Sequence, residues 1–178
     1  YGNIPQNRER IYIICIDKSL DSIYLDTHPD LIKLLSPEKQ PLKRTVRDLL
    51  ERNPLDEKFY YREDHIYYDR LHEAMKNPDT VYQWRRVYVR ENQSNVCPTL
   101  TANMGTGGHN VPLILDGERI RKLTPRECFN LQGFPEDYIL PKHLAMSSLY
   151  KQAGNSVSVP IIEALAKKMI DFMILRKI

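Results

Sequence analysis

The chain has 178 residues, of which 42% are hydrophobic, so it can form one domain, or one domain and a small lobe, with a real core. Its 26 Lys and Arg nearly balance its 23 Asp and Glu, so a nucleic acid would have to be bound by a local cluster of basic side chains. The three cysteines form no CxxC pair, which argues against a disulfide scaffold or a metal site and favours a reducing, cytoplasmic setting.

The chain opens with YGNIPQNRER, which lacks a signal-peptide layout, and no apolar run reaches the roughly 18 residues of a membrane span. A start at Tyr1 without Met is typical of a fragment. Residues 10–16, RIYIICI, are apolar on both faces, which predicts a strand buried on both sides. No alternating strand and helix pattern follows, so we expect its sheet to be completed by other polypeptide.

The middle of the chain predicts short elements. Residues 36–54 are polar and rich in proline, which indicates a domain boundary around a short helix at 45–52. Residues 64–77 have a helical pattern, and residues 80–90 alternate as a strand does. A strand, a glycine-rich loop and another strand are expected over residues 94–115.

Local turn and cap signals are clearest near Asp116. Asp116-Gly117 predicts a two-residue hairpin turn between strands. Thr124, followed by Pro125 and Glu127, predicts a capping box that opens a helix ending at Gly133. Two further helices are expected, one over residues 143–152 and an amphipathic one from Pro160 onwards.

Several segments carry candidate functional side chains. Gln6, Arg8 and Arg10 alternate on one face of the predicted strand, although an ordinary solvated strand entry explains them equally well. Glycines after Thr99-Leu100 would let backbone approach a DNA groove, yet hairpin loops use the same residues. Arginines interleave with aromatic residues between positions 43 and 90, where a solvated lobe is the competing interpretation.

Two motifs near the end of the chain also have both a structural and a functional interpretation. Cations around the capped start of the helix after Thr124 can hold phosphate, or the helix can simply pack on a core. QAGNSVSVP, residues 152–160, places Asn155 and Ser156 at a turn before the last helix, which is also what a helix end followed by a helix start looks like.

Taken together, these segments resemble the C-terminal part of bacterial cytosine-5 DNA methyltransferases. PQNRER resembles the QxRxR motif of the family, and Thr99-Leu100 before the glycines resembles its target recognition region. RKLTPRECFNLQGFPEDY and QAGNSVSVP resemble its last two motifs. The resemblance implies an α/β fold, with the remnant of an incomplete methyltransferase-type (Rossmann-like) sheet and a small mixed α+β target-recognition lobe. Residues 1–35 would end the catalytic domain, residues 36–140 would recognise the target, and residues 141–178 would return to the catalytic domain.

The resemblance also implies roles for single residues. Arg10 would help to hold a flipped cytosine through its O2 atom, while Arg8 and Gln6 would shape the active-site loop. The S-adenosylmethionine pocket would be completed by Asn155, Ser156 and Val157. Duplex DNA would be contacted by Arg85, Arg86, Thr99, Leu100, Thr101, Gly105, Gly107 and Gly108, and Arg121 and Arg126 would give support or touch phosphate.

The tripeptides Pro-Cys-Gln and Glu-Asn-Val, which carry the family's nucleophile and glutamate, do not occur in this sequence. We therefore expect a bacterial, cytoplasmic DNA (cytosine-5) methyltransferase portion, of a restriction-modification system, that is inactive without an N-terminal catalytic half. That half would belong to the same longer chain or to a separate subunit. The alternative is a stand-alone DNA-binding module without catalysis. A nuclease has only Asp48 and residues 56–58 in its favour.

Overall fold

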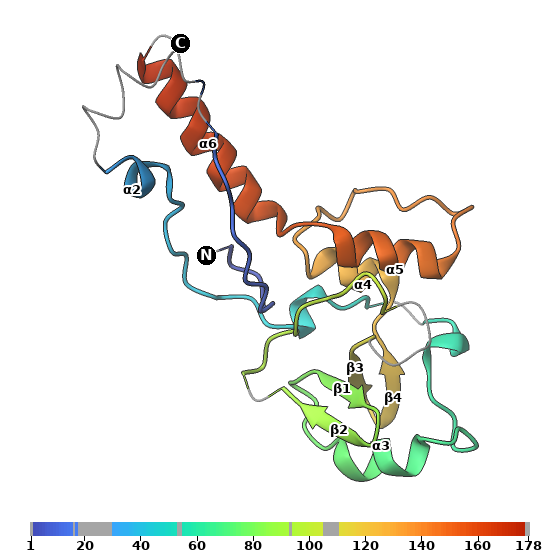
Figure 1. Cartoon of the computed structure of the whole chain (residues 1–178). Coiled ribbons are helices and arrows are strands. Elements are labelled where there is room, and N and C mark those ends of the chain that lie inside the picture. The colour runs from blue at the N-terminus through green and yellow to red at the C-terminus, as the bar shows by residue number, and fades with distance from the viewer. Residues whose placement is uncertain are drawn as a thin grey trace.

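The computed structural model describes residues 2–15, 17, 30–52, 55–92, 94–104 and 111–176. Figure 1 shows two parts: a lobe around a small sheet, and an arm in which the long helix α6 runs beside the start of the chain and helix α2. We call residues 45–155 the lobe, and residues 2–15, 30–44 and 159–176 the arm.

Four antiparallel strands form the sheet of the lobe, in the order β2-β1-β3-β4. Their bounds are Tyr82–Arg85 for β1, Tyr88–Glu91 for β2, Leu113–Asp116 for β3 and Arg119–Lys122 for β4. The hairpin at Asp116-Gly117 is confirmed, with Gly117 at a φ of 63° that glycine adopts without strain. The mixed α/β class is confirmed as well, with an antiparallel sheet.

The single strand expected over residues 80–90 is wrong, because the chain reverses after Arg85. The turn contains Arg86 at a φ of 54° and Val87, and neither residue is one that signals a hairpin. The alternating pattern of residues 80–90 therefore continues through the turn, although these residues form two strands and not one. One strand, expected near Cys97, is reduced to an isolated bridge.

One face of β1 packs on helix α3, Tyr68–Ala74. Tyr82 and Trp84 point into this cluster beside Leu71 and Leu113, and the rings of Trp84 and Tyr67 stack at 4.4 Å between centroids. Helix α3 is shorter than the expected 64–77, since the residues before it form turns. Because side chains alternate along a strand, Gln83 and Arg85 are left for the opposite face of β1.

A second core joins the sheet to helices α4, Pro125–Asn130, and α5, Met146–Asn155. The capping box of α4 is confirmed: the Thr124 hydroxyl accepts from the Glu127 N–H, and the Glu127 carboxylate accepts from the Thr124 N–H. Helix α5 begins and ends three residues later than expected, and Gly154 lies inside it rather than after it. A Cβ at Gly154 would lie 2.2 Å from the carbonyl of Thr101, so the close approach requires glycine.

The arm consists of α2, Leu31–Leu35, α6, Val159–Arg176, and the extended start of the chain. The buried strand expected at residues 10–16 is wrong for the described part, because residues 10–15 form no strand and Ile11 and Ile13 are 91% and 84% exposed. Their apolar character finds no covering layer among the described residues. Among the α6 side chains described, which end at Ile174, only Phe172 is buried, and it packs against Leu35. None of the described helices could span a membrane.

The connecting segment between the arm and the sheet contains two 3-10 turns, Arg47–Leu49 and Glu57–Phe59. The helix expected at 45–52 is therefore only a single turn. Val46 is buried next to it in the core shared with α4 and α5, which fixes where the chain enters the lobe.

Candidate functional site

The start of the chain pairs with the segment before the glycine-rich loop. The Asn7 N–H donates to the Cys97 carbonyl at 2.8 Å, and the Cys97 N–H donates to the Pro5 carbonyl at 2.7 Å. The Thr99 hydroxyl adds a hydrogen bond to the Asn7 carbonyl at 2.7 Å. Two segments that lie some 90 positions apart in sequence thus form one short parallel ladder.

Arg8 ties this ladder to the end of α5. Its guanidinium donates to the carbonyls of Leu100 at 2.9 Å, Gly154 at 3.0 Å and Ser156 at 2.6 Å. Burial and the charge of Arg10 lower the pKa of Arg8 from its usual value. The side chain therefore joins three segments that the sequence analysis singled out separately.

Gln6, Arg8 and Arg10 line one hollow of about 500 Å³, between the start of the chain and the first turn of α6. Arg10 is exposed at its edge, with its guanidinium hydrogen-bonded to the neighbouring Glu9 carbonyl at 2.5 Å. Ser158 and Ile161 form part of the opposite wall. The structure thus brings the side chains of Gln6, Arg8 and Arg10 together around one space.

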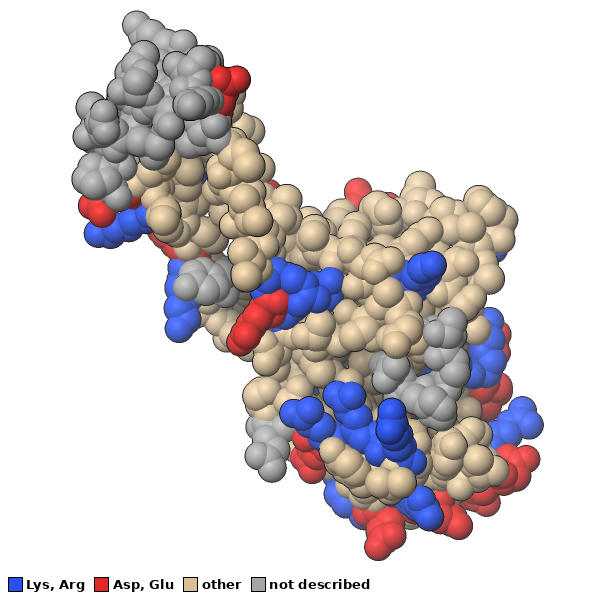
Figure 2. Space-filling view, in the orientation of Figure 1, with Lys and Arg blue, Asp and Glu red and all other residues tan. Residues whose placement is uncertain are grey.

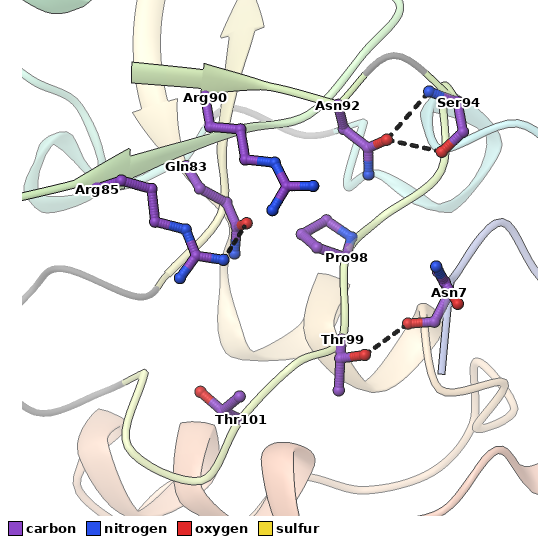
Figure 3. Close-up of a pocket in the computed structure, with 9 residues that line it drawn as sticks. All are labelled: Asn7, Gln83, Arg85, Arg90, Asn92, Ser94, Pro98, Thr99 and Thr101. Atoms are coloured by element: carbon purple, nitrogen blue, oxygen red, sulfur yellow. Dashed lines mark hydrogen bonds between the residues drawn. The ribbon is translucent and has the colours of Figure 1, made fainter. Parts of the chain in front are cut away.

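A second hollow, which we call the hairpin pocket, lies over β1 and β2 and has a volume of about 370 Å³ (Figure 3). Nine residues line it, and no Asp or Glu is among them: Asn7, Gln83, Arg85, Arg90, Asn92, Ser94, Pro98, Thr99 and Thr101. In Figure 3 the side chains of Gln83, Arg85 and Arg90 point toward the same space, with Thr99 and Thr101 on its other side. Asn7 lines both hollows.

The hairpin pocket follows from strand geometry. Gln83 and Arg85 leave the same face of β1, and Arg90 lies directly across from Gln83 on β2. Figure 2 shows basic side chains gathered over this part of the lobe. The Arg85 guanidinium donates to the Gln83 amide oxygen at 3.1 Å. A local basic cluster therefore exists in a chain whose net charge is only +3.

Arg121 is buried, with 1% of its side chain exposed, and is held by carboxylates. It makes a bidentate pair with Glu127, with both distances at 2.8 Å, and it also donates to Asp116 at 2.8 Å. Of the two roles expected for Arg121, support and phosphate contact, the structure gives it support. The expected DNA contact is wrong here, because a buried and fully paired guanidinium has no surface left for phosphate.

The expected DNA contact of Leu100 is wrong for the same reason, because its side chain is 1% exposed and packs in the main core. Only its carbonyl, which accepts from Arg8, takes part in the contacts described above. Arg126 lies apart from the hairpin pocket, in a hollow on α4, and donates to the Tyr138 carbonyl at 2.5 Å. Arg86 is exposed at the β1–β2 turn and does not line the pocket. Gly105, Gly107 and Gly108 lie outside the described residues.

The three candidates for a cofactor wall lie where α5 ends. Asn155 and Val157 are exposed, while the Ser156 hydroxyl donates to the Ala153 carbonyl at 2.7 Å. Ser156 also supplies one of the carbonyls that hold Arg8. Asn155 and Val157 therefore have surfaces free for a ligand, and Ser156 serves first to fix the turn.

Two of the three thiols are not prepared for nucleophilic attack. Cys97 and Cys128 are buried, and burial raises the pKa of each thiol above its usual value. Cys15 is exposed on the arm. Within the described ranges no three His, Cys, Asp or Glu side chains gather as a metal site would require.

Sequence reasoning missed Gln83 and Asn92 as pocket residues. The alternation Tyr-Gln-Trp-Arg in β1 could have shown Gln83, since it leaves the same face as Arg85. Asn92 carried no such signal, because its place depends on the loop that follows β2: its amide oxygen accepts from the N–H and the hydroxyl of Ser94.

The fold is similar to parts of two solved methyltransferases. A methyltransferase from S. pombe, Dnmt2, superposes with a TM-score of 0.57 at 16% identity, over 97% of this chain and 54% of that one. The Entamoeba histolytica methyltransferase EhMeth gives a TM-score of 0.55 at 14% identity, over 78% of this chain and 44% of that one.

Residues 1–171 match the model of the C-5 cytosine-specific DNA methylase family, and the chain belongs to that family. It is 54% identical to the type II methyltransferase M.Bsp6I of Bacillus sp. over 98% of this chain and 53% of that protein. Identity to M1.ScrFI of Lactococcus lactis is 34%, over 96% of this chain and 41% of that protein. The chain thus spans about half the length of these relatives.

Proposed function

We propose that this chain is the target-recognition and C-terminal portion of a DNA (cytosine-5) methyltransferase of a restriction-modification system. The complete enzyme transfers a methyl group from S-adenosylmethionine to C5 of cytosine in a specific duplex sequence. An N-terminal catalytic half, in the same longer chain or in a separate subunit, supplies the nucleophile, and this portion alone is inactive. Residues 1–35 and 141–178 belong with that half, and residues 36–140 read the DNA.

The observation that carries the proposal is the junction around Arg8. One guanidinium holds the carbonyls of Leu100, Gly154 and Ser156, while the Pro5 to Asn7 segment pairs with Cys97. The three segments that the family resemblance assigns to base positioning, target recognition and the cofactor wall therefore converge at one place. A protein that must hold a flipped base beside a methyl donor needs this convergence.

Two further features support a missing half. Cys97 and Cys128 lack activation, since burial raises the pKa of both thiols, whereas a nucleophilic thiol needs the opposite shift. The arm carries large exposed apolar side chains: Ile11, Ile13, Ile32, Ile170 and Ile174 are each more than half exposed. Such a surface is typical of one that packs against other polypeptide.

In this proposal Asn155 and Val157 form part of the S-adenosylmethionine pocket, and Ser156 holds the turn between them. Arg10 binds the O2 atom of the flipped cytosine, because its guanidinium is exposed at the rim of the hollow beside Gln6 and has no carboxylate partner among the described residues. Arg8 and Gln6 shape the loop around that base.

The test is complementation. The chain is co-expressed with a matching N-terminal half of the family, and transfer of labelled methyl from S-adenosylmethionine to cytosine in duplex DNA is measured. We expect transfer by the pair and none by either part alone. A pair that is inactive although both parts are folded would contradict the proposal. In an active pair, Arg10→Ala should lower turnover more than DNA binding, and Lys33→Ala, on α2, should lower neither.

The second candidate, a stand-alone DNA-binding module, is favoured by the hairpin pocket, which is built wholly from this chain. It predicts salt-dependent binding to duplex by the chain alone and no methyl transfer in any pairing.

A further inference from the structure

The arginines of the lobe divide into paired and unpaired ones. Arg47, Arg119 and Arg121 each form an ion pair with a carboxylate. Arg85 and Arg90 in the hairpin pocket form none with any described residue, and the lining contains no acid. Their positive charge is therefore not neutralised within the described part of the chain, which prepares the pocket for electron-rich groups of a ligand.

One of these two guanidiniums, that of Arg85, is held by a neighbouring side chain. The Arg85 guanidinium donates to the Gln83 amide oxygen, and Gln83 itself is buried, with 8% of its surface exposed. Tyr82 and Trp84 anchor the same strand in the core on its other face. A donor that is already fixed loses less conformational freedom when a ligand binds, so binding to it is stronger.

The opposite side of the pocket offers acceptors. The hydroxyl protons of Thr99 and Thr101 are committed to the Asn7 carbonyl at 2.7 Å and the Asn103 amide oxygen at 2.8 Å. Both residues line the pocket, and because each hydroxyl proton is already donated, each oxygen can act there only as an acceptor. A phosphate has only acceptors and gains nothing from such oxygens, whereas the major-groove edge of a G·C pair presents the guanine acceptors O6 and N7 beside the cytosine N4 donor.

We propose that the hairpin pocket reads the major-groove edge of a G·C base pair. Arg85 and Arg90 donate to O6 and N7 of guanine, and the oxygens of Thr99 and Thr101 accept from the N4 amino group of cytosine. Gln83 is a positioning residue that orients Arg85. This inference rests on the proposed function for its partner, duplex DNA, and adds which base pair the chain selects and by which side chains.

The test is selection of duplexes from a randomised library by the full chain. We expect guanine at one fixed position, and Arg90→Ala should lower the preference there roughly 5- to 100-fold. Arg70→Ala, exposed on α3 and outside the pocket, removes the same charge and should leave the preference unchanged. Gln83→Glu keeps the side-chain size but sets a carboxylate beside Arg85, which partly neutralises that cation, so the preference should fall.

A single 7-deazaguanine in the selected site sharpens the assignment, because it lacks the N7 acceptor. It should weaken binding by the unaltered chain and have little further effect on Arg90→Ala. If Arg90→Ala weakens all sequences equally and flattens the salt dependence, the pocket holds phosphate and the inference is wrong. An unchanged preference, or no preference in the unaltered chain, also overturns it.

Failure of the pocket and failure of the enzyme proposal give different results. A complemented pair that methylates DNA with the same specificity after Arg90→Ala rejects the pocket alone. Selection of guanine by the chain without methyl transfer by any folded pair rejects the enzyme proposal alone.

Discussion

Arginines behave in opposite ways in two neighbouring regions of the lobe. Around α4, Arg121 is buried and its charge is balanced by Glu127 and Asp116. In the hairpin pocket, Arg85 and Arg90 stand open beside amides and hydroxyls, with no acid in the lining. The comparison teaches that the role of an arginine here is decided by its carboxylates rather than by its residue type. The paired group holds the fold, and the unpaired group remains for a ligand.

The largest expected effect comes from breaking the paired group. Arg121→Ala leaves Glu127 as a buried charge without its cation, and should lower the free energy of unfolding by about 3–5 kcal/mol. Urea unfolding of the chain measures it. Arg47→Ala, which removes an exposed ion pair with Asp79, should cost about 1 kcal/mol or less. Equal losses in the two variants would remove the distinction.

Gly154→Ala tests the backbone contact that joins the two regions. The added methyl would meet the Thr101 carbonyl at 2.2 Å, so the free energy of unfolding should fall by about 1–3 kcal/mol. Because Thr101 lines the hairpin pocket, guanine selection should weaken too. Gly117→Ala, strained at a φ of 63° but with open space around it, should lower stability without affecting selection. The opposite pattern in the library selection would contradict this account.

A smaller effect is expected from pH. Burial acts to raise the pKa of Asp116, but hydrogen bonds from Tyr60 and Arg121 outweigh it, so its pKa lies below the usual value. The stabilisation is therefore complete above the ordinary carboxyl range and is lost as the pH falls through about 4 and below. Urea unfolding between about pH 6 and pH 3 should show a shallower loss for Asp116→Asn than for the unaltered chain. Identical slopes would show that Asp116 contributes nothing to acid sensitivity.

The smallest effect on stability is expected from the unpaired group, Arg85 and Arg90. Arg85→Ala with Arg90→Ala removes two exposed cations that have no carboxylate partner among the described residues, so the free energy of unfolding should change by less than about 0.5 kcal/mol. Thermal unfolding measures this, and DNA selection by the same protein should be lost. A strongly lowered Tm would place these residues with Arg121 instead.

The sequence predicted what neighbouring residues decide. The capping box of Thr124 and Glu127 and the turn at Asp116-Gly117 depend on side chains within a few positions, and both are present. The strand at residues 10–16 failed, because burial of Ile11 and Ile13 depends on what covers them and not on their own pattern. The turn at Arg86 was not predicted, because no residue typical of turns lies there in the sequence.

Within the candidate site, the sequence indicated the segments but not their connections. Arg8 was visible in its motif, yet its three carbonyl partners come from positions 100, 154 and 156. The sequence alone does not show that Arg121 and Arg85 have different partners. Only the fold shows that Arg121 pairs with Glu127 and that Arg85 donates to Gln83. Long-range pairing therefore had to come from the structure.

The ladder between Asn7 and Cys97 fixes the spacing between the two hollows. It is made of main-chain hydrogen bonds, which do not depend on side chains, and Asn7 borders both the hairpin pocket and the hollow of Arg10. Under our proposals this fixes the number of base pairs between the one that is read and the cytosine that is modified. New side chains on β1 and β2 would then change which base pair is selected and leave its distance from the modified cytosine unchanged. Sequence specificity can therefore be redesigned at a single base pair.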